Sequence, residues 1–496
     1  MAKAGCYSLH LGILLCTLLA RLSYALNNGV GRLPYLGYNT WNAYHCDIDE
    51  ELMLDIAKRM KSLGLYDAGY NWVNLDDCYA EKSRNAEGNI VEDQTRFKGG
   101  MKNLTSQIKE QGFHVGIYGD SGWYTCAGYP GSFRNEKRDA RTFHDWGFEL
   151  LKFDTCAVPY DSVIQQNNYG KFKPMSDAII ELAEETGTTP MIYSLCSWGW
   201  QQVWLWAHEQ GQAWRTTQDI EPNWKSISYI INNNSFITQA ADFYGHNDLD
   251  ILEVGNGELD FEESKSHFTA WAFMKSPLLV STDLTNITDA SLSILTNQEI
   301  IAINQDDVVG TSISPFKWGY NQDWTWDPEH PAEYWSGRSQ NGTVVMLLNT
   351  EDKPKAMTFQ FHESPWLRVG RKYSIRDLWA HTDNGTASRA FTAEGVPRHG
   401  VVALLLKDAG PEDEGIAPPC NDPRLTTTWW WGCTQPGVND GPDGATPPEH
   451  NKGDDTTHDH KTPVGTPAAN TESPFCHSLS AYRYHFALSM LYYICC

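Results

Sequence analysis

Hydrophobic and polar positions in the first three hundred residues follow two alternating patterns. Short apolar runs, which predict strands, are separated by amphipathic stretches, which predict helices. "DEELMLDIAKRMKSLGL" opens with acidic residues and closes at a glycine, as helices commonly do, and "MKNLTSQIKEQG" and "MSDAIIELAEETG" share this pattern. The runs predicted as strands cover 34–42, 71–78, 113–120, 148–156, 190–196, 213–219, 236–242 and 277–283.

Eight strands alternating with helices across residues 26–305 predict a (β/α)8 TIM barrel. The rival arrangement is a doubly wound open sheet. That fold usually carries a glycine-rich phosphate loop after its first strand, and this sequence has none.

The pattern changes after residue 305. The runs "GTVVMLLNT", "KAMTFQF", "KYSIRDLWA" and "HGVVALLL" have a period of two and are separated by turn residues. They predict an antiparallel β-sandwich domain over 306–408. Residues 409–496 are rich in Pro, Gly, Asp and Thr, which predicts a disordered or low-complexity tail whose purpose the sequence leaves open.

The N-terminus predicts export from the cell. Lys3 precedes the apolar run "LGILLCTLLA", and "SYA" offers a small-x-small cleavage site, so residues 1–25 are predicted to be a signal peptide of a secreted protein. Sequons for N-glycosylation agree with secretion. They lie at Asn103, Asn233, Asn286, Asn341 and Asn384.

Secretion also favours disulfides. The predicted barrel keeps five cysteines, an odd number that leaves one unpaired unless it pairs with the tail: Cys46, Cys78, Cys126, Cys156 and Cys196. The sequence leaves open how the cysteines of the tail pair: Cys420, Cys433, Cys476, Cys495 and Cys496.

Composition limits the classes of partner. A net charge of −24 argues against nucleic acid and against a stable membrane partner, because both repel an acidic surface. Aromatic residues make up 12% of the chain, which suits stacking on sugar rings and equally suits a large core. A homo-oligomer is left open.

Acidic residues recur where the predicted strands end: "LDDC", "YGD", "KFD", "TQD" and "AAD", with "NDLD" soon after. The carboxyl ends of barrel strands carry the chemistry in this fold. One such Asp would most simply cap the next helix. Six or more on one rim would repel one another without a polar ligand or paired cations, so we expect a binding site there.

Two of these acids have a cation nearby. In "LLKFDTC", Lys152 lies two residues before Asp154 and therefore on the same side of the strand, so we expect it to lower the pKa of Asp154. In "RTTQD", Arg215 precedes Asp219 by four residues. Either Lys/Asp or Arg/Asp pair alone would most simply be a buried ion pair. Two acids in unequal environments, however, are what glycosidic cleavage requires.

The ordered motifs of residues 26–408 resemble glycoside hydrolase family 27, the secreted α-galactosidases and α-N-acetylgalactosaminidases, and most closely the fungal α-galactosidases (melibiases). The motifs that carry the resemblance are "LGYNTWNAYHC", "NLDDC", "GIYGDSGWYTCAGYPGSF", "LLKFDTC", "YSLCSWGW", "WRTTQDI", "DLDILEVGNG" and "MKSPLLVSTDL".

The resemblance implies a retaining α-galactosidase with Asp154 as nucleophile and Asp219 as acid/base, acting on melibiose, raffinose-type oligosaccharides or galactomannan. It also implies disulfides Cys46–Cys78 and Cys126–Cys156, which leave Cys196 as a free thiol. The sugar-binding side chains that it implies are Trp41, Asp76, Asp77, Tyr118, Lys152, Cys196, Trp198, Arg215 and Asp250.

Two positions depart from the family pattern. Ser197 replaces the Glu of the usual "CEWG", and a small residue there enlarges the pocket beside the 2-hydroxyl in N-acetylgalactosaminidases. We expect Trp198 and Cys196 to exclude an N-acetyl group nevertheless. Ile251 replaces the Met of the usual "DPDM".

A lectin and a metalloenzyme are the two alternative functions. A galactose lectin would need one catalytic acid missing, and both are present. A metalloenzyme could place Mg²⁺ or Ca²⁺ on the acidic rim, but Lys152 and Arg215 would compete with the metal, and no H-x-H or H-E-x-x-H motif ends a strand. We therefore expect no metal and no cofactor.

Overall fold

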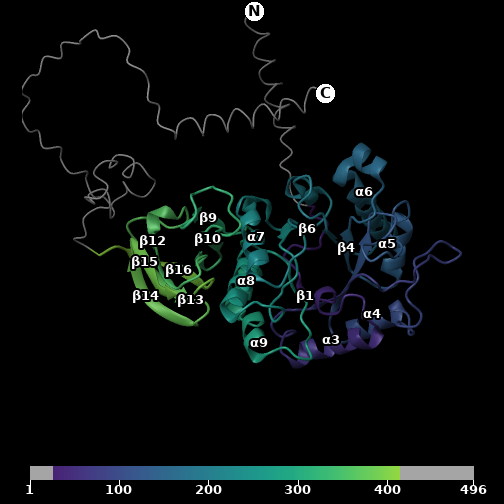
Figure 1. Ribbon diagram of the computed structural model, residues 1–496, viewed down its shortest axis with the longest axis horizontal. Coiled ribbons are helices and arrows are strands. Elements are labelled where there is room, and N and C mark those ends of the chain that lie inside the picture. The colour runs from purple at the N-terminus through teal and green to yellow at the C-terminus, as the bar shows by residue number, and fades with distance from the viewer. Residues whose placement is uncertain (1–25, 414–496) are drawn as a thin grey trace, which may run out of the picture. The chain divides into compact units, whose positions relative to one another are not determined.

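The computed structural model describes residues 26–413 (Figure 1). The predicted signal peptide and residues 414–496 of the predicted tail lie outside the described residues, as do the tail cysteines. The first residues of the predicted tail, up to Pro411, belong to the last strand of the second domain. Within 26–413, no helix is both long enough and apolar enough to cross a bilayer.

Eight parallel strands form one curled sheet in the order β7-β6-β5-β4-β3-β2-β1-β8, which confirms the predicted barrel. The ring closes just after β7, where the backbone N–H of Leu252 donates to the carbonyl of Leu279 (2.7 Å). The strands are β1 Leu36–Asn39, β2 Trp72–Leu75, β3 His114–Asp120, β4 Leu150–Asp154, β5 Ile192–Leu195, β6 Ala213–Arg215, β7 His246–Asp248 and β8 Leu278–Val280.

Helices separate these strands and cover the barrel. The first long helix, α3, begins as its sequence predicts, because the Asp49 side chain accepts the N–H of Leu52 (2.8 Å). The helices are α2 Trp41–Tyr44, α3 Glu50–Ser62, α4 Met101–Glu110, α5 Glu136–Asp145, α6 Tyr160–Thr186, α7 Trp224–Ser235, α8 Phe261–Phe273, α9 Asp289–Leu295 and α10 Gln298–Asn304.

The predicted seventh strand is wrong. Residues 236–242 form a turn of 3-10 helix at Thr238–Ala240, and Asp242 is exposed on a turn instead of ending a strand. The observed β7 is the polar triplet His246–Asp248, which has no apolar signal. Side-chain hydrogen bonds hold this triplet: Asn247 accepts from the Trp214 indole (2.8 Å) and donates to the Ile237 carbonyl (3.0 Å).

An antiparallel domain follows the barrel, as predicted. A six-stranded sheet (β14-β13-β16-β11-β10-β9) faces a two-stranded sheet (β12-β15), and apolar side chains such as Val345, Phe359 and Ile375 fill the space between them. The strands are β9 Ser314–Lys317, β10 Tyr334–Ser339, β11 Gly342–Leu348, β12 Lys355–Gln360, β13 Arg371–Asp377, β14 Thr382–Ser388, β15 Ala390–Val396 and β16 Val401–Pro411.

The large sheet is joined to the barrel by a continuous core. Trp335, Val344 and Met346 belong to the same buried cluster as the barrel helices. Ser266 on α8 donates to the carbonyl of His399 (2.5 Å), and the His399 ring stacks on Trp224 at 4.3 Å. The second domain therefore supports the barrel on the side of α7 and α8.

The polar strand β7 can be tested by substitution. We expect Asn247→Ala to lower the free energy of unfolding by about 2–4 kcal/mol, because the Trp214 indole and the Ile237 carbonyl would both lose a buried partner. Chemical denaturation measures this. The exposed Asn71→Ala is the control and should change stability by less than about 0.5 kcal/mol. An equally small effect of both substitutions on stability would contradict the conclusion that the hydrogen bonds of Asn247 hold strand β7 in place.

Candidate active site

A cavity of about 460 Å³ lies at the carboxyl ends of the barrel strands. Every strand from β1 to β7 supplies residues that line it, either from its last positions or from the turn that follows. All the sequence-predicted site residues line this one cavity: Trp41, Asp76, Asp77, Tyr118, Lys152, Asp154, Cys196, Trp198, Arg215, Asp219 and Asp250.

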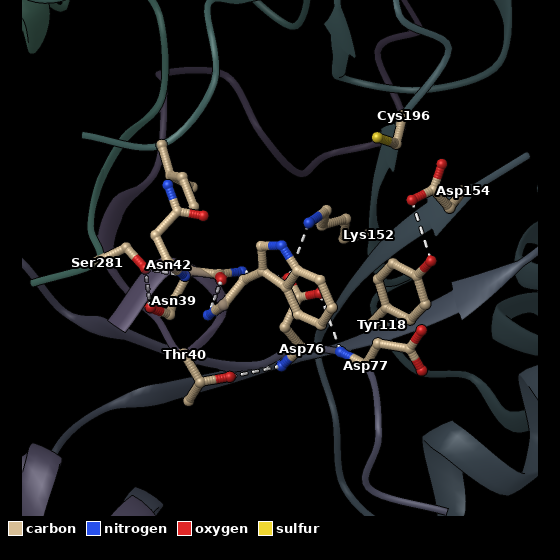
Figure 2. A network of polar contacts seen from close by, with 12 residues as sticks. Asn39, Thr40, Asn42, Asp76, Asp77, Tyr118, Lys152, Asp154, Cys196 and Ser281 are labelled. Atoms are coloured by element: carbon tan, nitrogen blue, oxygen red, sulfur yellow. Dashed lines mark hydrogen bonds and ion pairs between the residues drawn. The ribbon is translucent and has the colours of Figure 1, made fainter. Parts of the chain in front are cut away.

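Strand β4 places two charged side chains toward the cavity. Leu151 and Phe153 are completely buried, and Lys152 and Asp154 alternate with them and reach the cavity. The Lys152 ammonium donates to Asp76 Oδ2 (2.8 Å), not to Asp154. Asp154 instead accepts from the Tyr118 hydroxyl (3.0 Å), as Figure 2 shows.

Lys152 acts to lower the pKa of Asp154, as expected, but the net shift of this pKa is upward. Burial disfavours the carboxylate and raises the pKa of Asp154 to about 6, although the Lys152 charge and the Tyr118 hydroxyl both act to lower it. Only 6% of Asp154 is exposed, so the loss of hydration outweighs these favourable contacts.

Asp76 and Asp77, which follow β2, are held in place by many donors. Asp76 Oδ2 accepts from Asn39 (2.7 Å) as well as from Lys152, and Asp76 Oδ1 accepts the N–H of Asp77 (2.9 Å). Asp77 accepts the N–H groups of Cys78 (2.6 Å) and Ala127 (3.0 Å). Both carboxylates are therefore fixed before any ligand arrives.

Arg215, at the end of β6, joins two acids of the cavity. Its guanidinium bonds to Asp250 (2.6 Å) and Asp219 (3.0 Å). The Arg215 side chain is 4% exposed, whereas Asp219 is 75% exposed. Burial acts to lower the pKa of Arg215, but the neighbouring acidic groups, Asp250 first among them and Asp219 and Asp248 after it, together more than offset burial, and the pKa is raised. Asp219 and Asp154 thus have very different access to water.

The predicted disulfides are present, Cys46–Cys78 and Cys126–Cys156, and Cys196 is a buried free thiol. The first joins the turn after β1 to the turn after β2, and the second joins the loops after β3 and β4. Cys126 and Cys156 also lie near Asp120 and Asp154. Because their sulfur atoms are bonded to each other, they offer no thiolate for a metal.

Asp120, the last residue of β3, was given no role from the sequence although it ends a predicted strand. It is completely buried, pairs in register with Asp154, and accepts the N–H groups of Gly122 (2.6 Å) and Cys156 (2.9 Å). Burial, together with the nearby Asp154 charge, raises its pKa to about 9. Asp120 therefore holds together the two loops that flank Asp154.

A second group missed from the sequence lies opposite, after β7. Glu253 lines the cavity and accepts from the side-chain amides of Asn42 and of Asn256 (2.6 Å from the latter). Burial raises its pKa to about 7. Asn42 and Glu253 lie inside the motifs "LGYNTWNAYHC" and "DLDILEVGNG". The motifs therefore pointed to this part of the chain, but nothing in the sequence assigned a role to either residue.

Several lining or neighbouring residues adopt the left-handed backbone region that side chains other than glycine rarely occupy. The φ angles are 46° at His45, 75° at Cys78, 44° at Ala157, 52° at Trp198 and 81° at Asp250. Such conformations cost energy and cluster at functional sites. Their position around one cavity marks it as the functional site of the barrel.

Comparison with known proteins decides the family. The sequence profile of a family described as "Alpha galactosidase A" matches residues 33–306, and that of an "Alpha galactosidase C-terminal beta sandwich domain" matches 329–406. The chain belongs to the α-galactosidase family. The family is glycoside hydrolase family 27, so the protein is a glycoside hydrolase of the α-galactosidase type.

Known α-galactosidases align with this α-galactosidase over nearly their full lengths. A "Probable alpha-galactosidase B" of Penicillium simplicissimum is 40% identical over 418 residues, which cover 77% of this chain and 95% of the relative. Alpha-galactosidase I of Mortierella vinacea superposes with a TM-score of 0.71 at 35% identity over 78% of this chain and 100% of that one. The Saccharomyces cerevisiae enzyme solved with raffinose gives 0.68 at 29% identity over 77% and 99%.

The buried acids of the α-galactosidase predict how its stability depends on pH. The pKa values of Asp120 (about 9), Asp154 (about 6), Asp248 (about 6) and Glu253 (about 7) are all raised by burial. Between about pH 4 and 9 the folded protein therefore holds protons that the unfolded chain releases, so stability falls as pH rises.

The substitution Asp154→Asn tests whether stability falls as pH rises. We expect the substitution to raise the free energy of unfolding by about 1–2 kcal/mol at pH 8, because it removes a buried charge, and the gain should vanish below about pH 3, where Asp154 is protonated in both states. Thermal unfolding across this pH range measures it. The exposed Asp47→Asn should show no such trend. Destabilisation by Asp154→Asn at pH 8 would contradict the prediction.

Proposed function

We propose that this α-galactosidase removes terminal α-linked galactose by double displacement, with net retention of configuration. Asp154 is the nucleophile and Asp219 is the acid/base. The observation that carries the proposal is that these two carboxyl groups line one cavity in opposite environments, one buried on a strand end and one exposed beside Arg215.

In the first step Asp154 attacks the anomeric carbon while Asp219 gives its proton to the leaving glycosidic oxygen. In the second step Asp219 takes a proton from water, which attacks the same carbon and releases Asp154. The exposure of Asp219 supports this exchange, because its proton must come from solvent. Tyr118 supports Asp154 by donating to Oδ2.

Selectivity for galactose follows from the fixed acids after β2. The axial 4-hydroxyl and the 6-hydroxyl bind Asp76 and Asp77, with Lys152 on the side of the 3- and 4-hydroxyls, and the apolar face of the ring packs on Trp41. Glucose would leave these buried polar groups without a partner, which is strongly unfavourable.

The other side of the sugar is held by Arg215 and Asp250, which grip the 2- and 3-hydroxyls. Cys196 and Trp198 fill the space beside the 2-hydroxyl. Cys196 is 2% exposed and Trp198 packs edge-on against Trp200 at 5.0 Å, so the pair forms a firm wall.

The substrates proposed are melibiose, raffinose-type oligosaccharides and galactomannan. The proposal includes secretion after removal of residues 1–25, without a cofactor. Two disulfides and the exposure of four of the five sequons support passage through a secretory pathway. The fifth, Asn233, is half-buried and its amide donates to the Tyr229 carbonyl (2.8 Å).

Azide rescue distinguishes the two catalytic roles. We expect Asp154→Gly and Asp219→Gly each to lower kcat on 4-nitrophenyl α-galactoside at least about a thousandfold. Azide should then restore turnover in both variants. Without the nucleophile, azide attacks directly and gives the inverted β-galactosyl azide. Without the acid/base, azide attacks the glycosyl-enzyme and gives the α product. NMR of the products decides, and identical configurations from both variants would refute the assignment.

The wall beside the 2-hydroxyl predicts exclusion of N-acetylgalactosamine. We expect kcat/KM for an α-N-acetylgalactosaminide to be at least about a hundredfold below that for the matched α-galactoside, because the acetamido group clashes with Trp198. Trp198→Ala should narrow this ratio. Trp366→Ala removes an exposed ring of the second domain that does not line the cavity, and should leave the ratio unchanged. Equal hydrolysis of both substrates by the unsubstituted enzyme would overturn the argument.

A further inference from the structure

The loop between β9 and β10 exposes three aromatic rings within seven residues. Tyr320 is 62% exposed, Trp324 is 71% exposed and Trp326 is 55% exposed. Most of this loop lies between the two segments that the family profiles match, 33–306 and 329–406. Single exposed rings are ordinary on a protein surface, but such a group in one short loop marks an interaction site.

The loop has a defined conformation. The N–H of Trp318 donates to the Asp323 carboxylate (2.9 Å), and the amide of Asn321 donates to the carbonyl of Thr325 (2.7 Å). The N–H of Thr325 also donates to the carbonyl of Gln322 (3.0 Å). These bonds fold residues 318–325 into a compact turn.

Two of the exposed rings are backed by other rings. Trp324 lies 4.8 Å from Trp318, which is almost completely buried, and Tyr320 lies 4.3 Å from His330. Rings that are held in this way lose little conformational freedom when a ligand packs on them, which favours binding.

The chemistry around the rings identifies the kind of ligand. Amides and carboxylates that can bond to hydroxyl groups stand beside the rings, and residues 318–333 contain no Lys or Arg and no Leu, Ile, Val or Met. An anionic polymer would be repelled by the acids, and a second copy of the chain would bring the same acids together. A neutral polymer of sugar rings suits both the exposed aromatic rings and the amides and carboxylates beside them. The flanking polar residues are Asn321, Gln322, Asp323, Asp327 and Glu329.

The loop is anchored to the helix that leads away from the catalytic cavity. Ser228 on α7 donates to the carbonyl of Pro328 (2.6 Å), and the N–H of Asp327 donates to Asn232 (3.3 Å). Figure 1 shows β9 and β10 beside α7. Helix α7 begins at Trp224, just after Pro222 of the cavity lining, and its rise from Trp224 to Asn232 is about 12 Å. A polymer a few sugar rings long can span such a distance.

We propose that Tyr320, Trp324 and Trp326 form a non-catalytic binding site for the backbone of a neutral, galactose-substituted polysaccharide of the galactomannan class. The proposal rests on the α-galactosidase function stated above. Sugar rings of the backbone pack their apolar faces on the aromatic rings, and the flanking amides and carboxylates bond to hydroxyls. A polymer held here presents its galactose branches to the cavity at a raised local concentration.

Electrophoresis of the full-length protein in native gels that contain galactomannan tests the site. The variants are Trp324→Ala/Trp326→Ala together and Trp326→Ala alone, since Trp324 contacts Trp318 and its loss could disturb the loop. Trp366→Ala, which removes a 42% exposed ring elsewhere in the second domain, is the matched control. We expect the double variant to bind galactomannan about tenfold or more weakly and the control to bind normally, because each sugar face removed from water contributes to affinity.

Hydrolysis separates this proposal from the catalytic one. In the double variant, KM for galactomannan should rise severalfold, whereas kcat/KM for 4-nitrophenyl α-galactoside should stay within about twofold. Galactomannan retardation that is unchanged in both variants would overturn the proposal. So would light scattering that shows a dimer of the unsubstituted protein and a monomer of the double variant. The unsubstituted protein could bind galactomannan through these rings and yet fail to hydrolyse 4-nitrophenyl α-galactoside. That result would refute the catalytic proposal but would support the binding site.

Discussion

The crowding of carboxylates, most of them buried, around one cavity is the constraint on which the rest of this structure depends. Withdrawing charged groups from water is costly unless other charges and hydrogen bonds replace the lost hydration. Two cations do most of this here: Lys152 binds Asp76, and Arg215 binds Asp250. Among the described residues no cation forms an ion pair with Asp154, and the pKa of Asp154 stays raised.

The arrangement also explains why the rim is so heavily constrained. Loops that carry the acids would spread apart under their repulsion, and the two disulfides and the completely buried Asp120 oppose this by joining the turns after neighbouring strands. The left-handed backbone at Cys78, Trp198 and Asp250 shows that the surrounding structure dictates these positions. Stability is reduced locally so that polar groups stand ready for a polar ligand.

The catalytic cavity and the exposed aromatic loop lie in different parts of the chain. The barrel and the β-sandwich carry the family match, and the cavity belongs entirely to the barrel. The aromatic loop at 318–330 lies largely between the two matched segments and attaches to the outside of the barrel through α7. The proposed polysaccharide-binding surface is thus separate from the catalytic cavity on the same fold.

The local sequence pattern predicted much of the fold and of the candidate active site. Apolar runs and helix signals predicted seven of the eight barrel strands. Most of the acids at strand ends, with Lys152 and Arg215, line the cavity, whereas Asp120 and Asp242 do not. This worked because strand periodicity and the carboxyl-end rule depend on residues close in sequence. Tertiary structure alone decided the rest. The strand His246–Asp248 exists through bonds to Trp214 and Ile237, and the pKa of Asp154 rises because burial, which sums over residues from the whole barrel, exceeds the effect of one nearby ammonium. Asp120 and Glu253 likewise gain their significance only from the partners that folding brings to them.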